Sequence, residues 1–197
     1  MRLFRLSAAA LVLFAAGCAA LPGGGPDPLD TFELSAPRAP ERPARGGTQI
    51  LIAEPTALKA IDTQNIVVAP TPASIEYLAG AQWADRLPRV VQDGLVETFQ
   101  NLGGFAGVGK PGQGLAIDYQ VIVDIRSFEV RVNGTATANV VFSVKLLNDR
   151  NGQVRAARDF QATAPVAGAG NEAYVAGLDA AFRQVAGEIV DWTRERV

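Results

Sequence analysis

The chain has 197 residues, 48% of them hydrophobic and 19% charged, which is typical of one folded domain with a sizeable core. Its 18 Lys and Arg residues and 20 Asp and Glu residues give a net charge of −2, so binding to nucleic acid is not expected. The chain has no His and one Cys, which excludes His-dependent catalysis, an intramolecular disulfide, and metal sites built from His or several Cys. Carboxylate chemistry, phosphate binding by backbone amides, and no chemistry at all stay open.

The first residues follow the order of a secretory signal peptide. Basic residues and an apolar run at 6–16 are followed by Ala15-Ala16-Gly17 and the only cysteine, Cys18. An apolar helix of this length would measure about 17 Å, too short for a hydrocarbon core of about 30 Å. The order resembles a bacterial lipobox, in which Cys18 is acylated, although Ala15 stands where Leu is usual. The alternative is an ordinary signal peptide with an incidental cysteine.

These features predict three segments. We expect residues 1–17 to be a lipoprotein signal peptide, 18–29 a lipidated cysteine with a flexible tether, and 30–197 a single α+β periplasmic domain. Residues 19–28 are rich in Gly and Pro and could reach at most about 35 Å. Multiple acyl chains on Cys18 would hold the protein on a membrane, because each buried CH₂ contributes about 0.8 kcal/mol. Ala19 stands where an inner-membrane retention signal has Asp, which favours the outer membrane.

Short strands are expected first along the mature chain. Residues 31–34 and 49–54 have extended patterns, and residues 65–69 and 74–78 lie on either side of the turn sequence Pro70-Thr71-Pro72.

The spacing of apolar residues then changes to that of a helix over residues 83–102. Asp85 is the expected N-cap, with Pro88 at the third helical position, and Gly103-Gly104 ends the helix. A second helix of about twenty residues is predicted at residues 175–192, where apolar residues again recur at intervals of three and four.

Between the helices, apolar residues alternate with polar ones. They occupy odd positions from 115 to 125 and even positions from 128 to 132, so we expect a β-bulge near Arg126-Ser127. A three-residue loop at 132–134 would pair Val130 with Ala136 and place Gly134 in the left-handed conformation. Asn151-Gly152 predicts a second turn. The sequence therefore predicts an α+β fold, an antiparallel sheet with two main helices packed on one face.

Three motifs have simpler explanations than a functional site. The run from Gly104 to Lys110 fits G-x-x-x-x-G-K, but Pro111 replaces the hydroxyl residue of a phosphate-binding loop, so a helix-to-strand loop is expected. Asp118 and Asp124 fit an exposed strand face better than a paired-carboxylate site. Asn133-Gly134-Thr135 is explained by a turn. We therefore assign no catalytic residue, no metal and no cofactor.

Several segments carry a resemblance to a known family. Cys18, Thr31-Phe32-Glu33-Leu34, Ile66-Val67-Val68, Ile75-Glu76-Tyr77 and Trp83-Ala84-Asp85-Arg86-Leu87 resemble the ABC-type transport auxiliary lipoproteins, the PqiC-like group. Thr31-Phe32 replaces a tyrosine pair that is frequent in the family. The resemblance covers most of the mature chain.

The resemblance implies a non-enzymatic docking component of an MCE-type (mammalian cell entry) lipid transporter. Its partners would be an MCE-domain protein, a permease and an ATPase, with the membrane held through acylated Cys18 and a second copy as a further partner. Ile75, Tyr77, Leu78 and Trp83 are the expected partner or oligomer contacts, because they gather apolar side chains outside the regular elements. Two alternatives are a lipid carrier in its own right and a structural assembly lipoprotein of the pilotin type.

Overall fold

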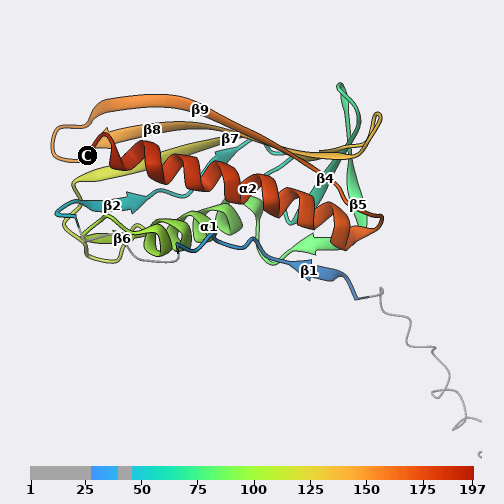
Figure 1. Cartoon of the computed structure of the whole chain (residues 1–197), viewed down its shortest axis with the longest axis horizontal. Helices are drawn as coiled ribbons and strands as arrows, with labels where there is room; N and C mark the ends of the chain where they lie inside the picture. Colours follow the sequence, from blue (N-terminus) through green and yellow to red (C-terminus); the bar gives the residue numbers. More distant parts are fainter. Residues whose placement is uncertain (1–27, 40–45) are drawn as a thin grey trace, which may run out of the picture.

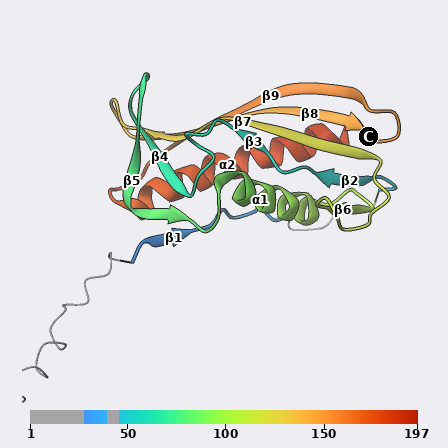
Figure 2. The same cartoon turned by 180° about the vertical axis from the view of Figure 1, so that it is seen from behind.

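The computed structural model describes residues 28–39 and 46–197, which form a curved mixed sheet and two helices (Figures 1 and 2). Its elements, in chain order, are β1 (Asp30–Phe32), β2 (Gln49–Ile52), β3 (Thr56–Ala57), β4 (Asn65–Thr71), β5 (Ser74–Trp83), α1 (Leu87–Leu102), β6 (Gly107–Gly109), β7 (Tyr119–Arg131), β8 (Thr137–Asn148), β9 (Gln153–Pro165) and α2 (Asn171–Arg194).

The long strand β7 organises the sheet. One of its edges pairs with β8, which pairs in turn with β9, and both pairings are antiparallel. Its other edge pairs in succession with β2, β3 and β4, all of them parallel to it. The α+β prediction is confirmed, but the sheet is mixed rather than wholly antiparallel, because short strands from the first third of the chain line up along β7 in its own direction.

The remaining strands extend this arrangement. β4 and β5 form an antiparallel hairpin, β1 runs parallel to the last residues of β5, and β6 runs parallel to β2. The short strands β3 and β6 were not expected from the sequence. β6 is a Gly-Val-Gly segment whose pairing with β2 involves no alternation of apolar and polar side chains.

The predicted β-bulge is confirmed. The register of β7 and β8 shifts between Ile125 and Ser127, which leaves Arg126 as the extra residue and keeps both apolar runs on the inner face.

The predicted three-residue loop between β7 and β8 is wrong. Val130 pairs with Ala138 rather than Ala136. The N–H of Val132 donates to the carbonyl of Ala69 in β4, and the carbonyl of Ala136 accepts the N–H of Val166 after β9, both at 3.1 Å. Residues 132 and 136 are thus held by other neighbours, so the loop is longer.

The two helices pack on the same face of the sheet, as expected. Ile52 in β2, Val121 in β7 and Leu146 in β8 are register partners, so their buried side chains share one face. α1 is attached to this face by the buried side-chain amide of Gln92, which donates to the carbonyl of Ile52 at 2.9 Å. α2 packs on the same face through buried aromatic rings. Phe182 of α2 contacts Phe142 of β8, and Trp192 of α2 contacts Phe160 of β9.

The helices also approach each other closely. A Cβ atom at Gly94 of α1 would lie 2.7 Å from the ring of Phe182 in α2, so only glycine allows this crossing. The segment after β1 then runs to α2, where the N–H and hydroxyl of Ser35 donate to Asp179 at 2.6 and 2.7 Å. The N-terminal part of the described chain is therefore fastened to the helical layer.

The start of α1 differs from the prediction. Trp83 is the last residue of β5, and the helix begins at Leu87, with Pro88 as its second residue. Asp85 does not cap the helix, because its carboxylate accepts the N–H of the adjacent Arg86 at 2.6 Å. Gly103, at φ 68°, ends the helix as expected.

Candidate functional site

The β4–β5 hairpin projects from the body of the molecule, and we refer to it as the arm (Figures 1 and 2). All four residues expected to contact a partner lie on β5, but only Ile75, Tyr77 and Leu78 lie on its projecting part. Ile75 is 43% and Tyr77 49% exposed, while Leu78 is half-buried and packs against the core. Large apolar side chains left this exposed on a protruding element are typical of a contact surface.

The arm is held in position by contacts at its base. Its register shifts between Asn65 and Val67, which leaves three extra residues in β5, where Gly80 has φ 73°. The side-chain amide of Asn171, at the start of α2, donates to the carbonyl of Ala79 at 3.1 Å.

A second brace comes from Tyr77 itself. Its hydroxyl donates to the carbonyl of Ala60, in the loop after β3, at 3.1 Å. The ring is therefore fixed while half of its surface stays exposed, so little conformational entropy is left to lose when a partner binds.

Trp83 does not belong to this surface, which corrects the sequence-based expectation. Its side chain is 1% exposed and packs edge-on against Phe128, with ring centroids 5.8 Å apart. Its backbone pairs with Phe32 in β1, and its N–H donates to the carbonyl of Gln64. Trp83 and Ala81 alternate inward at the end of β5, so the indole serves the core.

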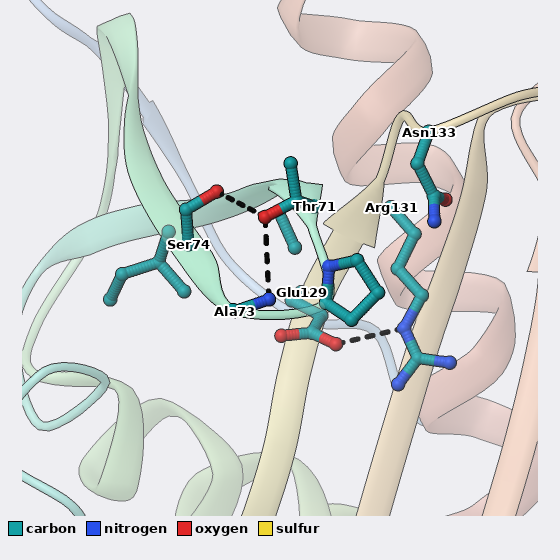
Figure 3. Close-up of a pocket in the computed structure, with 9 residues that line it drawn as sticks. Thr71, Ala73, Ser74, Glu129, Arg131 and Asn133 are labelled. Carbon is teal, nitrogen blue, oxygen red and sulfur yellow. Dashed lines mark hydrogen bonds and ion pairs between the residues drawn. The ribbon is translucent and has the colours of Figure 1, made fainter.

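A groove lies at the junction between the arm and the end of β7 (Figure 3). It exists because β4 runs parallel to β7, with Ala69 beside Arg131, so the tip of the arm stands over the polar face of β7. The groove has a volume of about 390 Å³ and is lined by Ala69, Thr71, Pro72, Ala73, Ser74, Ile75, Glu129, Arg131 and Asn133.

Four polar side chains of the groove are paired with one another. The hydroxyls of Thr71 and Ser74 are 2.7 Å apart, and the Thr71 hydroxyl also accepts the N–H of Ala73. Arg131 Nε donates to Glu129 Oε1 at 2.9 Å, so the two charges offset each other. No hydrogen bond joins either hydroxyl to the Glu129 carboxylate, so neither hydroxyl is paired with a general base in this groove.

The carboxyl groups with lowered pKa values lie elsewhere. The N–H of Arg86, and then the guanidinium of Arg89, lower the pKa of Asp85 beside α1. The N–H of Gln49, followed by the guanidinium of Arg150, lowers the pKa of Asp118. Each stabilises a loop, and neither faces the groove.

The remaining sequence motifs do not form a site. Lys110 follows β6, pairs with Asp93 of α1, and donates its N–H to Gln113, so its loop is already internally bonded and does not cradle a phosphate. Asp118 and Asp124 each have their own partners, and Asp124 contacts Thr56 and Arg126. Over residues 28–39 and 46–197, no group of three or more His, Cys, Asp or Glu residues could hold a metal ion.

Sequence reasoning did not identify the groove residues Glu129, Arg131 and Asn133. They are distant from the arm along the chain and come together only through the parallel pairing of β4 with β7. The turn signals at Pro70-Thr71-Pro72 and Asn133-Gly134 were the available clue, because both turns lie at this end of the molecule.

Two membrane-related points complete the description. Cys18, the expected lipidation site, lies outside the described residues. Within the ranges that the structure covers, neither helix has the combination of length and apolar composition needed to cross a membrane.

Comparison with known proteins identifies the family. An uncharacterized protein of Bradyrhizobium diazoefficiens is 32% identical over 176 residues, which cover 87% of this chain and 46% of that protein, so the chain spans about half the length of this curated relative. A crystal structure of a Xanthomonas campestris protein superposes with a TM-score of 0.74 at 28% identity, covering 84% of this chain and 95% of that one. A family model described as the ABC-type transport auxiliary lipoprotein component matches residues 32–190. The chain therefore belongs to the family of ABC-type transport auxiliary lipoprotein components.

Proposed function

We propose that the protein is a membrane-anchored, non-enzymatic docking component of an MCE-type ABC lipid transport system working between the inner and outer membranes. The family membership supports a role as an auxiliary transport component. The observation that carries the proposal further is the arm, which presents Ile75 and Tyr77 to solvent on a hairpin held at its base, beside a groove whose charged side chains are paired with each other.

The anchor in this proposal is acylated Cys18, which follows a signal peptide at residues 1–17, and the acyl chains lie in the outer membrane. Residues 18–29 form the tether, and the folded domain occupies residues 30–197. The twelve residue steps from Cys18 to Asp30 span at most about 40 Å, which limits how far the domain works from the bilayer.

The arm is the surface that meets the MCE-domain protein or a second copy of this chain. Ile75 and Tyr77 supply exposed apolar area, and the half-buried Leu78 supports them from the core side. Aromatic anchors fixed before binding contribute more affinity than mobile ones, because less side-chain entropy is lost.

Site-specific photo-crosslinking in living cells tests the arm. A photo-reactive amino acid at Ile75 or Tyr77 should give an adduct with the MCE-domain protein. Leu115 is the matched control, because it is an apolar residue that is 38% exposed beside β6, away from the arm. Equal adducts from Leu115, or adducts from the arm with a secretin alone, would overturn the proposal, and the second result would favour a pilotin-type role.

Replacement of the anchor tests the membrane part of the proposal. Cys18→Ser removes the acylated sulfur and should release the protein from the outer-membrane fraction, with the same change in outer-membrane lipid composition as deletion of the gene. Retention of Cys18→Ser in that fraction would contradict the proposed lipid anchor.

A carrier role for the domain itself has less support. The space between β8, β9 and α2 is filled by the rings of Phe142, Phe160, Phe182 and Trp192, all nearly inaccessible to solvent. Solvent extraction and mass spectrometry of the purified protein should therefore detect no stoichiometric lipid beyond the acyl chains on Cys18.

A further inference from the structure

The strand β9 forms an open edge of the sheet. It is 13 residues long and pairs only with β8, so its other edge has no strand partner within the described part of the chain (Figures 1 and 2). A free edge presents a row of backbone N–H and C=O groups that can pair with another strand. Many proteins shorten such an edge, or interrupt it with proline, yet here the only proline is the last residue, Pro165.

A bulge at Arg155 and charged side chains protect the edge instead. Arg158 lies on the helix-facing side of β9, the same side as Ala156 and Phe160, and its guanidinium carbon is 4.8 Å from the centre of the Phe160 ring. A strand added beside β9 would cover this guanidinium. Burial of an unpaired charge is costly, so the added strand must bring a carboxylate opposite Arg158.

Two more cations border the same part of the edge. Arg155, the extra residue of the bulge in β9, lies next to Ala156 and points to the outer side, and Lys145 lies on the neighbouring strand, paired with Ala157. Lys145, Arg155 and Arg158 are exposed, and none has an ion-pair partner among the described residues, whereas Arg126, Arg131 and Arg150 do. The one carboxylate on β9 is Asp159. A chain with a net charge of −2 thus keeps three positive charges at this edge without ion-pair partners in the described residues, one on the helix-facing side and two on the outer side.

We propose that the segment of β9 from Gln153 to Phe160 binds an extended acidic segment of a partner protein as an added β-strand. Backbone hydrogen bonds would supply the pairing. A carboxylate on the helix-facing side would meet Arg158, and carboxylates on the outer side would meet Arg155 and, across Ala157, Lys145, which would supply the selection. A second copy of this chain is a poorer occupant, because its own β9 would bring two arginines to the edge. The inference uses neither Cys18 nor the arm, so it stands or falls independently of the proposed transport role.

Peptide binding to the full chain, purified in detergent, tests this site. The probe is a fluorescent ten-residue peptide in which pairs of Val alternate with pairs of Glu, so that an extended strand presents carboxylates on both of its faces. Fluorescence anisotropy should show binding that weakens as salt is added. The same peptide with Lys in place of Glu should not bind. A third peptide, with N-methyl groups on alternate residues, keeps the charge but cannot form the strand pairing and should also fail.

Two double variants with equal charge change locate the site. Lys145→Gln with Arg155→Gln should weaken binding of the acidic peptide about tenfold, whereas Arg38→Gln with Lys59→Gln should leave it unchanged. All four side chains are exposed, so both variants should keep the circular dichroism spectrum of the parent.

Several results would overturn the proposal. They are absence of binding by the acidic peptide, equal binding by the N-methylated peptide, and equal effects of the two double variants. Self-association of the parent chain that disappears in the Lys145→Gln, Arg155→Gln variant would replace the acidic partner with a second copy.

Discussion

Two aromatic side chains of β5 show how residues on one strand take different roles. Tyr77 is half exposed on the arm, and Trp83 is buried against Phe128 six residues later. Between them, the extra residues of β5 around Gly80 turn the strand from the projecting arm into the body of the sheet. The type of side chain alone therefore does not separate a contact residue from a core residue here.

Substitution of these two residues should separate their roles. Trp83→Ala should lower the free energy of unfolding by about 3–5 kcal/mol, because it leaves a cavity in the core. Tyr77→Ala should lower it by less than about 1 kcal/mol, because the ring is half exposed and loses one surface hydrogen bond. Urea unfolding followed by circular dichroism measures both values, and equal losses would contradict the assignment of Tyr77 to the surface.

Acid should destabilise the protein partly through Asp118. Its pKa is lowered in the folded state, first by the N–H of Gln49 and then by the guanidinium of Arg150, so the folded state takes up a proton less readily than the unfolded state. The stabilisation is present at neutral pH, declines once the unfolded carboxyl titrates below about pH 5, and is lost as pH falls through the folded pKa.

The variant Asp118→Asn provides the measurement. It should be less stable than the parent at pH 7, and the difference between the two should shrink toward pH 3, as followed by urea unfolding. Asp159→Asn is the control, since Asp159 is an exposed carboxylate on β9 with no ion-pair partner in the described chain. If the difference in free energy of unfolding between Asp118→Asn and the parent stays constant with pH, the carboxylate of Asp118 does not contribute pH-dependent stability.

At the scale of elements, sequence patterns correctly predicted the features that depend on contacts between residues close in the chain. The change of parity near Arg126 identified the bulge in β7, and the apolar spacing identified α2. The same spacing misplaced Trp83, which lies four residues before Leu87 and so fits a helical period as well as the inward alternation of β5. An apolar residue at such a boundary satisfies both periods.

Pairings between distant segments escaped prediction because no local pattern encodes them. The stretch of β4 from Val67 to Ala69 meets β7 about sixty residues later, and this parallel pairing creates the groove beneath the arm. The loop between β7 and β8 was mispredicted for the same reason, because the N–H of Val132 donates to the carbonyl of Ala69 in β4 instead of closing a tight turn. The sequence alone thus identified Ile75 and Tyr77 of the candidate site. It did not identify Glu129 and Arg131, which β7 contributes.

The crossing of α1 and α2 gives a prediction for a pair of glycines. Gly94→Ala should lower the free energy of unfolding by about 1–3 kcal/mol, because its Cβ would lie 2.7 Å from the fully buried ring of Phe182. Gly187→Ala, in α2, meets no atom within 4 Å and should raise the stability by up to about 1 kcal/mol through helix propensity. Thermal and urea unfolding of both variants tests the crossing, and stabilisation by both would contradict it.

At the scale of the whole molecule, the two candidate surfaces lie at different places. The arm projects at the end where β1 begins, whereas the turn between β8 and β9 lies at the opposite end, near the C-terminus (Figure 1). The body between them is one continuous hydrophobic core. A domain of this shape can hold two partners at once without either covering the other.

The charge on β9 should also keep the molecules apart from each other. Arg158→Val replaces an inward-facing charge on the free edge with a residue favoured in strands, so self-association should increase. Analytical ultracentrifugation of the full chain in detergent measures the self-association of Arg158→Val. The control is Arg183→Val, a substitution on the exposed side of α2. An unchanged sedimentation coefficient for Arg158→Val at high protein concentration would show that the guanidinium is not what protects the edge.

The position of Val197 has a practical consequence for the study of this protein. The last residue lies beside Arg150 and Asn148, next to the turn that leads into β9, and far from the hairpin that carries Tyr77. A bulky reporter fused after Val197 would therefore crowd the proposed site on β9 and leave the arm accessible. Adducts formed through Tyr77 should survive such a fusion, whereas capture of an acidic peptide should suffer.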